Sequence, residues 1–237
     1  SARLVVFTAI ATAFWSSAVG SILLSLYIIG IVLAILIALM LKRFIFRGIT
    51  SPFIMELPPY QMPSLKVAVT QMWIKGSLFF KKAGTIVFLG LLIVGFLATT
   101  DASTLSFTND IEYSLVAVIG HKLQPIFTPL NWDWRLVVAI IFGFIAKEIV
   151  IGTTAMLYGV SEEEFSIFLA SHYDPVTMYA YMLFVLIYVP CIATLAAVKH
   201  ETQSWKWVIF TIVYETLLAY TISLIILFLG RIVFSGV

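Results

Sequence analysis

Apolar runs of about 20 residues constrain the fold most, because a helix rising about 1.5 Å per residue needs that length to cross about 30 Å of hydrocarbon. Hydrophobic residues make up 62% of the 237 residues and charged residues only 11%, which is far more apolar surface than a soluble core could hide. The sequence predicts an all-α polytopic membrane protein with about five to six membrane helices. The expected runs are residues 4–15, 21–41, 83–99, 134–158, 178–198 and 205–228.

Charge and motif content exclude several classes of function. The formal charge of +2 is small and the basic residues are dispersed, so the sequence lacks the footprint that binding to nucleic-acid phosphates requires. The single cysteine, Cys191, excludes an internal disulfide and any cysteine-pair zinc motif. The zinc-protease, serine-hydrolase and phosphate-loop signatures are absent from the sequence. We therefore predict a protein that is not an enzyme and holds no firmly bound cofactor.

The stretch at residues 42–82 is basic, since its one acidic residue is Glu56. The positive-inside tendency places this stretch in the cytoplasm. Prolines including Pro58 and Pro59 prevent a continuous helix before residue 63, and we interpret Glu56, Pro58 and Pro59 as interfacial residues. Apolar and basic residues share residues 64–80 in a pattern typical of an amphipathic helix that lies in the membrane interface.

These features divide the chain into first helices at residues 1–50, a cytoplasmic interfacial segment at 51–82 and a helical region at 83–237. Within the last part, residues 100–133 are expected to form an external loop that contains a short helix near residues 111–123. The start of the chain lacks an initiator Met and a basic leader, and we expect it to lie inside a larger protein.

If each apolar run crossed the membrane in turn, the loops between the runs would violate the positive-inside tendency. This simple alternation places Lys199 and Lys206 outside and the acidic linker at residues 161–175 inside. One broken or re-entrant segment would remove the conflict. Residues 134–158 and 178–198 both contain residues that could break a helix, and the sequence leaves the choice open.

The first candidate site is Lys147 and Glu148, which lie in the middle of an apolar run that also carries Gly143. Ionisable groups at membrane depth are costly unless they face protein, water or a counter-charge. Adjacent helical positions diverge by about 100°, so the two side chains should address different neighbours. They form either a structural ion-pair network or part of a cation path, with Glu148 supplying oxygen ligands.

The second candidate site is Pro190 with Cys191 and Thr194. Proline removes a backbone donor and breaks the helix, which should leave the carbonyl near Leu186 without its helical partner. Discontinuous helices mark substrate sites in transporters, and Thr194 should share a helix face with Cys191. The alternative interpretation of Cys191 is an inert buried thiol.

Glu215 is a third charge inside an apolar run, and Lys147 is a candidate partner for its carboxylate. The histidines lie in or near loops and are interpreted as solvated side chains rather than metal ligands. They are His121, His172 and His200.

Five stretches resemble the ferrous iron transport protein B (FeoB) family, in the same order along the chain. Proteins of that family join a cytoplasmic GTP-binding domain to a helical membrane domain with two gate regions. The resemblance implies that this chain is the second half of the membrane domain, with Cys191 at the second gate cysteine; the first gate and the nucleotide domain would lie elsewhere. The stretches are SPFIMELPPY (51–60), KKAGT (81–85), GFIAKE (143–148), PCIATL (190–195) and SWKW (204–207).

The resemblance implies a component of a ferrous iron permease in the inner membrane of a prokaryote, with Fe(II) as substrate. Its metal ligands would be Cys191 and Glu148, while Lys147, Pro190 and Thr194 would line or gate the path. Glu215 belongs to none of the five stretches; as a charge inside an apolar run it is a further candidate for lining or gating the path, and its role is left open. Fe(II) accepts thiolate and carboxylate ligands, and sulfur would favour it over Mg²⁺. GTP and Mg²⁺ would bind only in the absent domain. Expected partners are lipid, the rest of the transporter, small cytoplasmic accessory proteins and further copies of the chain.

Two alternatives remain open from the sequence. The chain could be a membrane assembly subunit in which buried charges only join helices, and then replacing Lys147 and Glu148 would unfold it. It could instead be a permease for another solute such as a nucleoside, which nucleoside competition would reveal.

Overall fold

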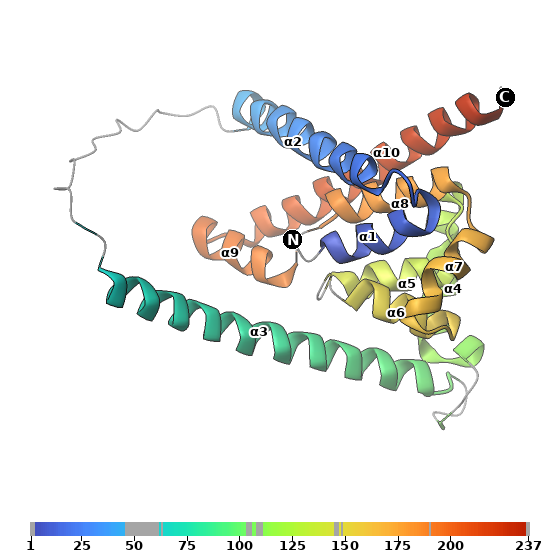
Figure 1. Cartoon of the computed structure of the whole chain (residues 1–237), viewed down its shortest axis with the longest axis horizontal. Coiled ribbons are helices and arrows are strands. Elements are labelled where there is room, and N and C mark those ends of the chain that lie inside the picture. Colours follow the sequence, from blue (N-terminus) through green and yellow to red (C-terminus); the bar gives the residue numbers. More distant parts are fainter. Residues whose placement is uncertain are drawn as a thin grey trace.

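The computed structural model describes residues 3–45, 62, 64–102, 106–107, 111–144, 147, 149–189 and 191–235, and its regular elements in these ranges are all helices. The predicted all-α fold class is therefore confirmed. Figure 1 shows a bundle in which short helices pack with the long helices α2 and α10, and α3 extends from this bundle. The elements are α1 Arg3–Phe14, α2 Val19–Phe44, α3 Leu65–Thr99, η1 Ile111–Tyr113, α4 Leu115–Phe127, η2 Thr128–Leu130, α5 Trp134–Gly143, α6 Ile149–Tyr158, α7 Glu162–His172, α8 Pro175–Ile187, α9 Ile192–Thr202 and α10 Trp205–Ser235.

Two helices in the described part are long and apolar enough to cross a membrane. They are Val19–Phe44, with a mean hydropathy of 3.1, and Trp205–Ile232, with a mean hydropathy of 2.1. The other apolar helices in the described ranges are shorter than 18 residues. The prediction of about five to six spanning helices was based on the lengths of the apolar runs. In the structure, much of this apolar sequence forms short helices, so the predicted number of spanning helices stays a prediction.

α3 differs from the expected arrangement, because a single 35-residue helix replaces the predicted interfacial helix and the separate run after it. Neither a proline nor a pair of adjacent glycines interrupts residues 65–99, and isolated glycines are tolerated inside a helix. The C-terminal part of α3 packs on α4 and α6, with Val94 and Ala98 buried there. The first half is exposed, including Met72 and Trp73.

The apolar run at residues 134–158 folds back on itself. α5 and α6 have 10 residues each, so each rises only about 15 Å, half of the hydrocarbon thickness. Asp133 precedes α5 and Tyr158 ends α6, yet the Tyr158 hydroxyl donates to the Asp133 carboxylate at 2.7 Å. The two helices are therefore antiparallel and form a hairpin, and Lys147 lies at its tip, between the end of α5 and the start of α6.

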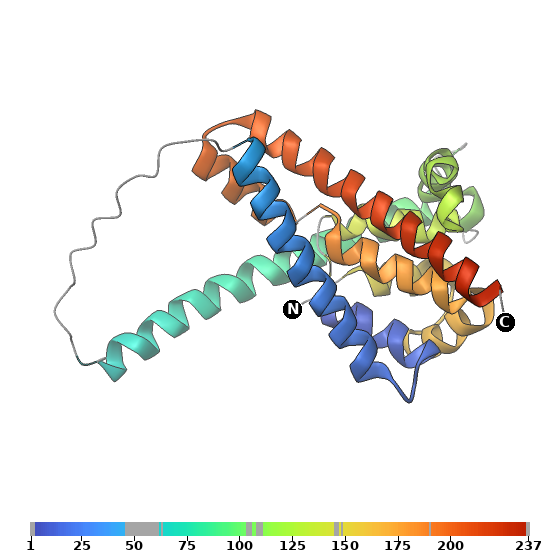
Figure 2. The same cartoon turned by 90° about the horizontal axis from the view of Figure 1, so that it is seen from above.

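The second run is broken as well, between α8 and α9, so the expectation of one broken segment was too low. Both α8 and α9 pack along α10, and Figure 2 shows them side by side with it. The Trp132 ring meets the rings of Tyr181 and Phe184 on α8 edge to face, with centroids 5.1 Å apart in both pairs. These buried aromatic contacts fix α8 at the centre of the bundle.

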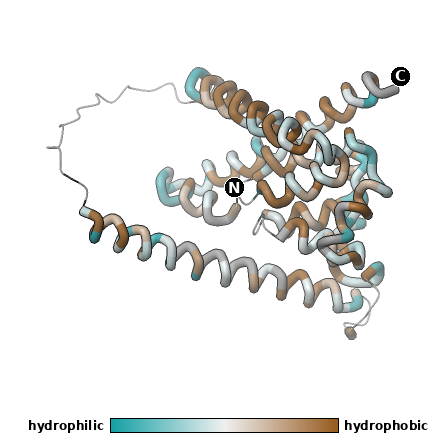
Figure 3. The backbone as a smooth tube through the Cα atoms, in the orientation of Figure 1, coloured by the Kyte–Doolittle hydropathy of each residue, from teal (hydrophilic) through white to brown (hydrophobic). Residues whose placement is uncertain are grey.

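The hairpin is the kind of re-entrant segment that would remove the charge conflict of simple alternation. Figure 1 shows α9 and the C-terminal end of α2 at one end of the molecule, opposite α4 and α7. The basic end of α2, with Lys42 and Arg43, thus shares a side with Lys199 at the end of α9. Hydrophilic residues gather at both ends while the middle of α2 is hydrophobic (Figure 3). The basic ends of α2 and α9 and the acidic α7 therefore lie at opposite ends of the molecule, an arrangement compatible with the positive-inside tendency.

Candidate functional site: two facing helix breaks

The breaks of the α5–α6 hairpin and of α8–α9 meet inside the bundle. The Lys147 ammonium at the hairpin tip donates to the backbone carbonyl of Tyr188 at 3.2 Å. It also lies 4.1 Å from the centroid of the Tyr188 ring. Lys147 is 5% exposed, so its charge is satisfied by a carbonyl dipole and an aromatic face instead of by water.

Local sequence explains why α8 ends where it does. The residue before a proline is disfavoured in the helical region, and α8 ends at Ile187, before Pro190. Tyr188 and Cys191 both have extended backbone conformations, with ψ of 166° and 159°. Pro190 itself lies outside the described residues.

The carbonyls released by this break have found cationic partners. The carbonyl of Leu186, which we expected to lose its helical partner, accepts a hydrogen bond from the Arg3 guanidinium of α1. The carbonyl of Tyr188 accepts from Lys147. Two cations from distant parts of the chain therefore bind the unwound end of α8, which is the negative end of its helix dipole.

Cys191 lies at the start of α9 and is half-buried. Its Sγ is 3.4 Å from the Thr194 Oγ1, so the predicted shared helix face is confirmed. The Cys191 carbonyl accepts from the backbone amides of Thr194 and Leu195 at 2.8 and 3.2 Å. The thiol is thus held at the start of α9, directly after the break.

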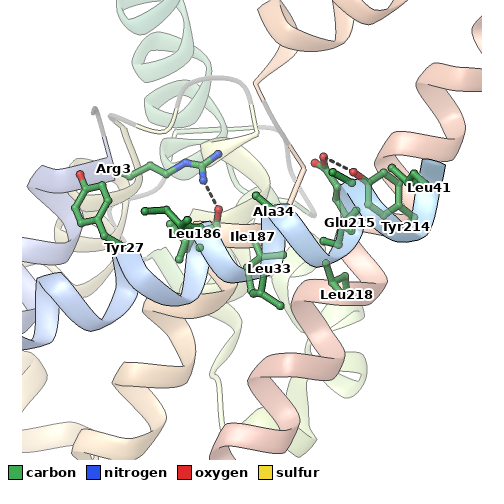
Figure 4. A pocket seen from close by; sticks show the side chains of 14 residues that line it. Arg3, Tyr27, Leu33, Ala34, Leu41, Leu186, Ile187, Tyr214, Glu215 and Leu218 are labelled. Carbon is green, nitrogen blue, oxygen red and sulfur yellow. Dashed lines mark hydrogen bonds between the residues drawn. The ribbon is translucent and has the colours of Figure 1, made fainter. Parts of the chain in front are cut away.

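A cavity of about 540 Å³ lies beside the break, between α2, α8 and α10. Its polar groups are Arg3, Tyr27 and the pair Tyr214 and Glu215, and apolar side chains such as Leu186 complete the wall. Figure 4 shows Arg3 and Glu215 approaching the cavity from different helices. An open, mostly apolar cavity with a few convergent polar groups is typical of a binding site.

The predicted partnership between Glu215 and Lys147 is not a direct contact. The Glu215 carboxylate instead accepts a hydrogen bond from the neighbouring Tyr214 hydroxyl at 3.1 Å, and no ion pair joins it to Lys147 among the described residues. Glu215 and Cys191 nevertheless contribute to the electrostatic environment of both Arg3 and Lys147. The site therefore combines two cations, one carboxylate and one thiol.

Several candidate residues fall outside the described part of the chain. They are Glu56, Pro58, Pro59, Glu148 and Pro190. Within the described ranges, no group of three or more His, Cys, Asp or Glu side chains is positioned to hold a metal ion. Fe(II) ligation by Cys191 and Glu148 stays a prediction.

Sequence reasoning missed a polar cluster at the acidic end of the molecule. Asp133 caps α5 by accepting from the Leu136 amide at 3.1 Å, and it also binds the Tyr158 hydroxyl. The Tyr158 and Tyr173 hydroxyls are 2.6 Å apart. Burial, followed by the charge of Asp133, raises the pKa of Tyr173 above its usual range. The cluster joins the two ends of the hairpin to α7, and only the position of Asp133 as a helix cap was readable from the sequence.

Tyr188 and Arg3 were also missed as site residues. Tyr188 was detectable in principle, because it precedes the helix-breaking proline by two residues. Nothing in the local sequence connects Arg3 to a carbonyl on α8.

Two family models match the chain. The model described as "Gate: Nucleoside recognition" matches residues 80–205, which include both breaks. The model described as "Ferrous iron transport protein B C terminus" matches residues 23–75.

Curated relatives match along nearly the whole chain. A protein named Fe(2+) transporter FeoB from Methanocaldococcus jannaschii is 44% identical, over 99% of this chain and 36% of the relative. A Porphyromonas gingivalis protein named as a fusion of Fe(2+) transport protein A and Fe(2+) transporter FeoB is 32% identical, over 99% of this chain and 33% of the relative. A Staphylococcus aureus Fe(2+) transporter FeoB is 31% identical, over 98% of this chain and 35% of the relative. The chain thus spans about a third of the length of these relatives, and no solved structure matches it.

Proposed function

The chain belongs to the ferrous iron transport protein B family, as part of its C-terminal membrane region with the Gate domain, and we propose that it forms part of the path by which Fe(II) crosses a prokaryotic cytoplasmic membrane. The proposal covers a part of a longer transporter, because the relatives are about three times as long.

The observation that carries the proposal is the contact between the two helix breaks. Lys147 at the hairpin tip binds the Tyr188 carbonyl at the end of α8. Transporters place substrate sites where discontinuous helices meet near the middle of the bilayer, because unwound backbone there offers polar atoms to the solute. A structural ion-pair network that only joins continuous helices would need neither break.

Cys191 is the proposed sulfur ligand on this path. It follows the break directly and shares a face with Thr194, which would be its polar neighbour. Thiolate favours Fe(II) over Mg²⁺, and binding as thiolate would release a proton. Glu148 is the proposed oxygen ligand, while Pro190 keeps the helix broken and Glu215 supplies negative charge from the adjacent cavity.

The remaining parts of the transporter would supply the energy and the regulation. A GTP-binding domain outside this chain would act on it from the cytoplasmic side, and a first gate region, also outside this chain, would lie beside it in the membrane. Small cytoplasmic accessory proteins and further copies of the chain are the other proposed partners.

The test is anaerobic Fe(II) uptake into vesicles that contain the full-length parent transporter, with the amount of folded protein matched between variants. Cys191→Ser should reduce the initial uptake rate at least about tenfold, since it replaces the soft ligand by a hydroxyl that remains protonated. Ala196→Ser is the matched control, because it adds a hydroxyl at an exposed position on the same helix and should leave uptake unchanged. Equal rates for Cys191→Ser and the wild type would return the thiol to an inert packing role.

A nucleoside permease is the second candidate function, and the description of the Gate model as nucleoside recognition favours it. The same vesicles distinguish the two. Inhibition of uptake by nucleosides, together with nucleoside uptake that Fe(II) does not inhibit, would support the second candidate.

A further inference from the structure

The Lys147 ammonium is held by groups that also bind metal cations. Its described contacts are the Tyr188 carbonyl at 3.2 Å and the face of the Tyr188 ring at 4.1 Å. Among the described residues, no carboxylate lies within ion-pair distance of it. A backbone carbonyl at a helix break is the kind of oxygen that unwound transporter helices present to cations.

The surroundings of this ammonium contain an unsatisfied polar group. The Tyr188 hydroxyl is buried and has no hydrogen-bond partner among the described residues. It lies at the hairpin, where a Cβ added to Gly143 would be only 2.6 Å from it. A buried hydroxyl without a partner costs free energy, and it offers a polar atom to a ligand or to water that enters between the breaks.

The charges around the break repel an incoming cation in this conformation. Arg3 holds the Leu186 carbonyl and Lys147 holds the Tyr188 carbonyl, so both released oxygens already have cationic partners. Glu215 and Cys191 interact with these cations electrostatically. A divalent ion could bind here only after one of the two cations has left.

We propose that the Lys147 side chain is a built-in cation that occupies the niche between the two breaks and that an incoming divalent metal cation must displace it. The niche is defined by the Tyr188 carbonyl and ring and the adjacent Cys191. Lysine suits the role better than arginine because its ammonium is a compact point charge on a flexible stem. Displacement would couple entry of the cation to movement of the hairpin tip. This inference rests on the proposed function.

The single thiol provides a direct measurement of the charge in the niche. Cys191 is modified in membranes by two methanethiosulfonate reagents of similar size, one carrying a trimethylammonium group and one a sulfonate. The ratio of the two rates is measured from the Cys191 peptide by mass spectrometry. Lys147→Met should raise the ratio of cationic to anionic modification at least about tenfold, because a neighbouring positive charge is removed from a site of low dielectric.

Two variants serve as controls for this measurement. Lys147→Arg keeps the charge and should keep the wild-type ratio. Lys199→Met removes a lysine from the exposed end of α9, where salt screens its charge, and should also keep the wild-type ratio. An unchanged ratio in Lys147→Met overturns the inference.

A wild-type measurement covers the case in which Lys147→Met does not fold. A water-soluble succinimidyl ester acylates Lys147 in the presence and absence of anaerobic Fe(II), and the modified peptide is quantified. Displacement by the metal should raise acylation of Lys147 several-fold, and unchanged acylation at Fe(II) concentrations that support uptake overturns the inference. If the wild type takes up no Fe(II), the proposed function fails, and the thiol-labelling ratio decides separately whether Lys147 supplies the charge of the niche.

Discussion

Gly143→Ala should disturb the contact between the two breaks with a single methyl group. Gly143 is the last residue of α5. A Cβ built at this position would lie 2.4 Å from Val150 Cγ2 and 2.6 Å from the Tyr188 hydroxyl. Ordinary contacts between carbon atoms are about 3.5–4.0 Å, so α6 and the end of α8 must both move away.

The expected decrease in the free energy of unfolding follows from two opposing effects. Overpacking a buried site costs about 1–3 kcal/mol, and the stiff β-branched side chain of Val150 cannot rotate away easily. Replacing glycine by alanine in a helix gains up to about 1 kcal/mol, and less at a helix end. We expect Gly143→Ala to lower the free energy of unfolding by about 1–2 kcal/mol.

The measurement is an SDS titration of the purified protein in non-ionic detergent micelles, followed by tryptophan fluorescence. Gly76→Ala is the matched control, since a Cβ there has no atom within 4 Å and the residue lies inside α3. The free energy of unfolding of this control should equal that of the wild type or exceed it by up to about 1 kcal/mol. Equal stability of Gly143→Ala and Gly76→Ala would refute the reasoning that the two breaks are in close contact.

Two further predictions concern the acidic end of the molecule. Tyr158→Phe removes the hydroxyl that bridges the α5 cap and α7 and should cost about 1–2 kcal/mol in the same titration; Tyr113→Phe, at an exposed ring, is its control, and equal losses would contradict a role for the bridge. Asp174→Ala removes the cap of α8, which accepts from the Thr177 amide and hydroxyl at 2.9 and 2.6 Å, and should cost about 1–2 kcal/mol. Asp174→Asn retains a capping oxygen and should cost clearly less, so similar losses for both variants would show that capping is not the cause.

Much of the local structure was predictable because its causes are local. The extent of α2, the helix in the loop after α3 and the acidic α7 follow from apolar length, flanking charges and capping residues. The breaks near Gly143 and Pro190 were anticipated because glycine and proline alter the backbone wherever they occur. The prediction that separate helices end at residue 80 and begin at residue 83 was wrong, since α3 continues through this point. Lysines at a helix surface change the environment of that surface without breaking the helical hydrogen bonds.

The sequence by itself determined that this chain is helical and apolar, which of its segments are basic or acidic, and which few polar residues need partners inside the bundle. It did so because burial, charge and proline geometry act on single residues and their neighbours. Only the tertiary structure decided that residues 134–158 form a hairpin, that Lys147 binds a carbonyl 41 residues away, and that Arg3 binds one 183 residues away. Many partners could satisfy a buried cation equally well in local terms, and the packing of α8 against α1, α2 and α10 selects among them.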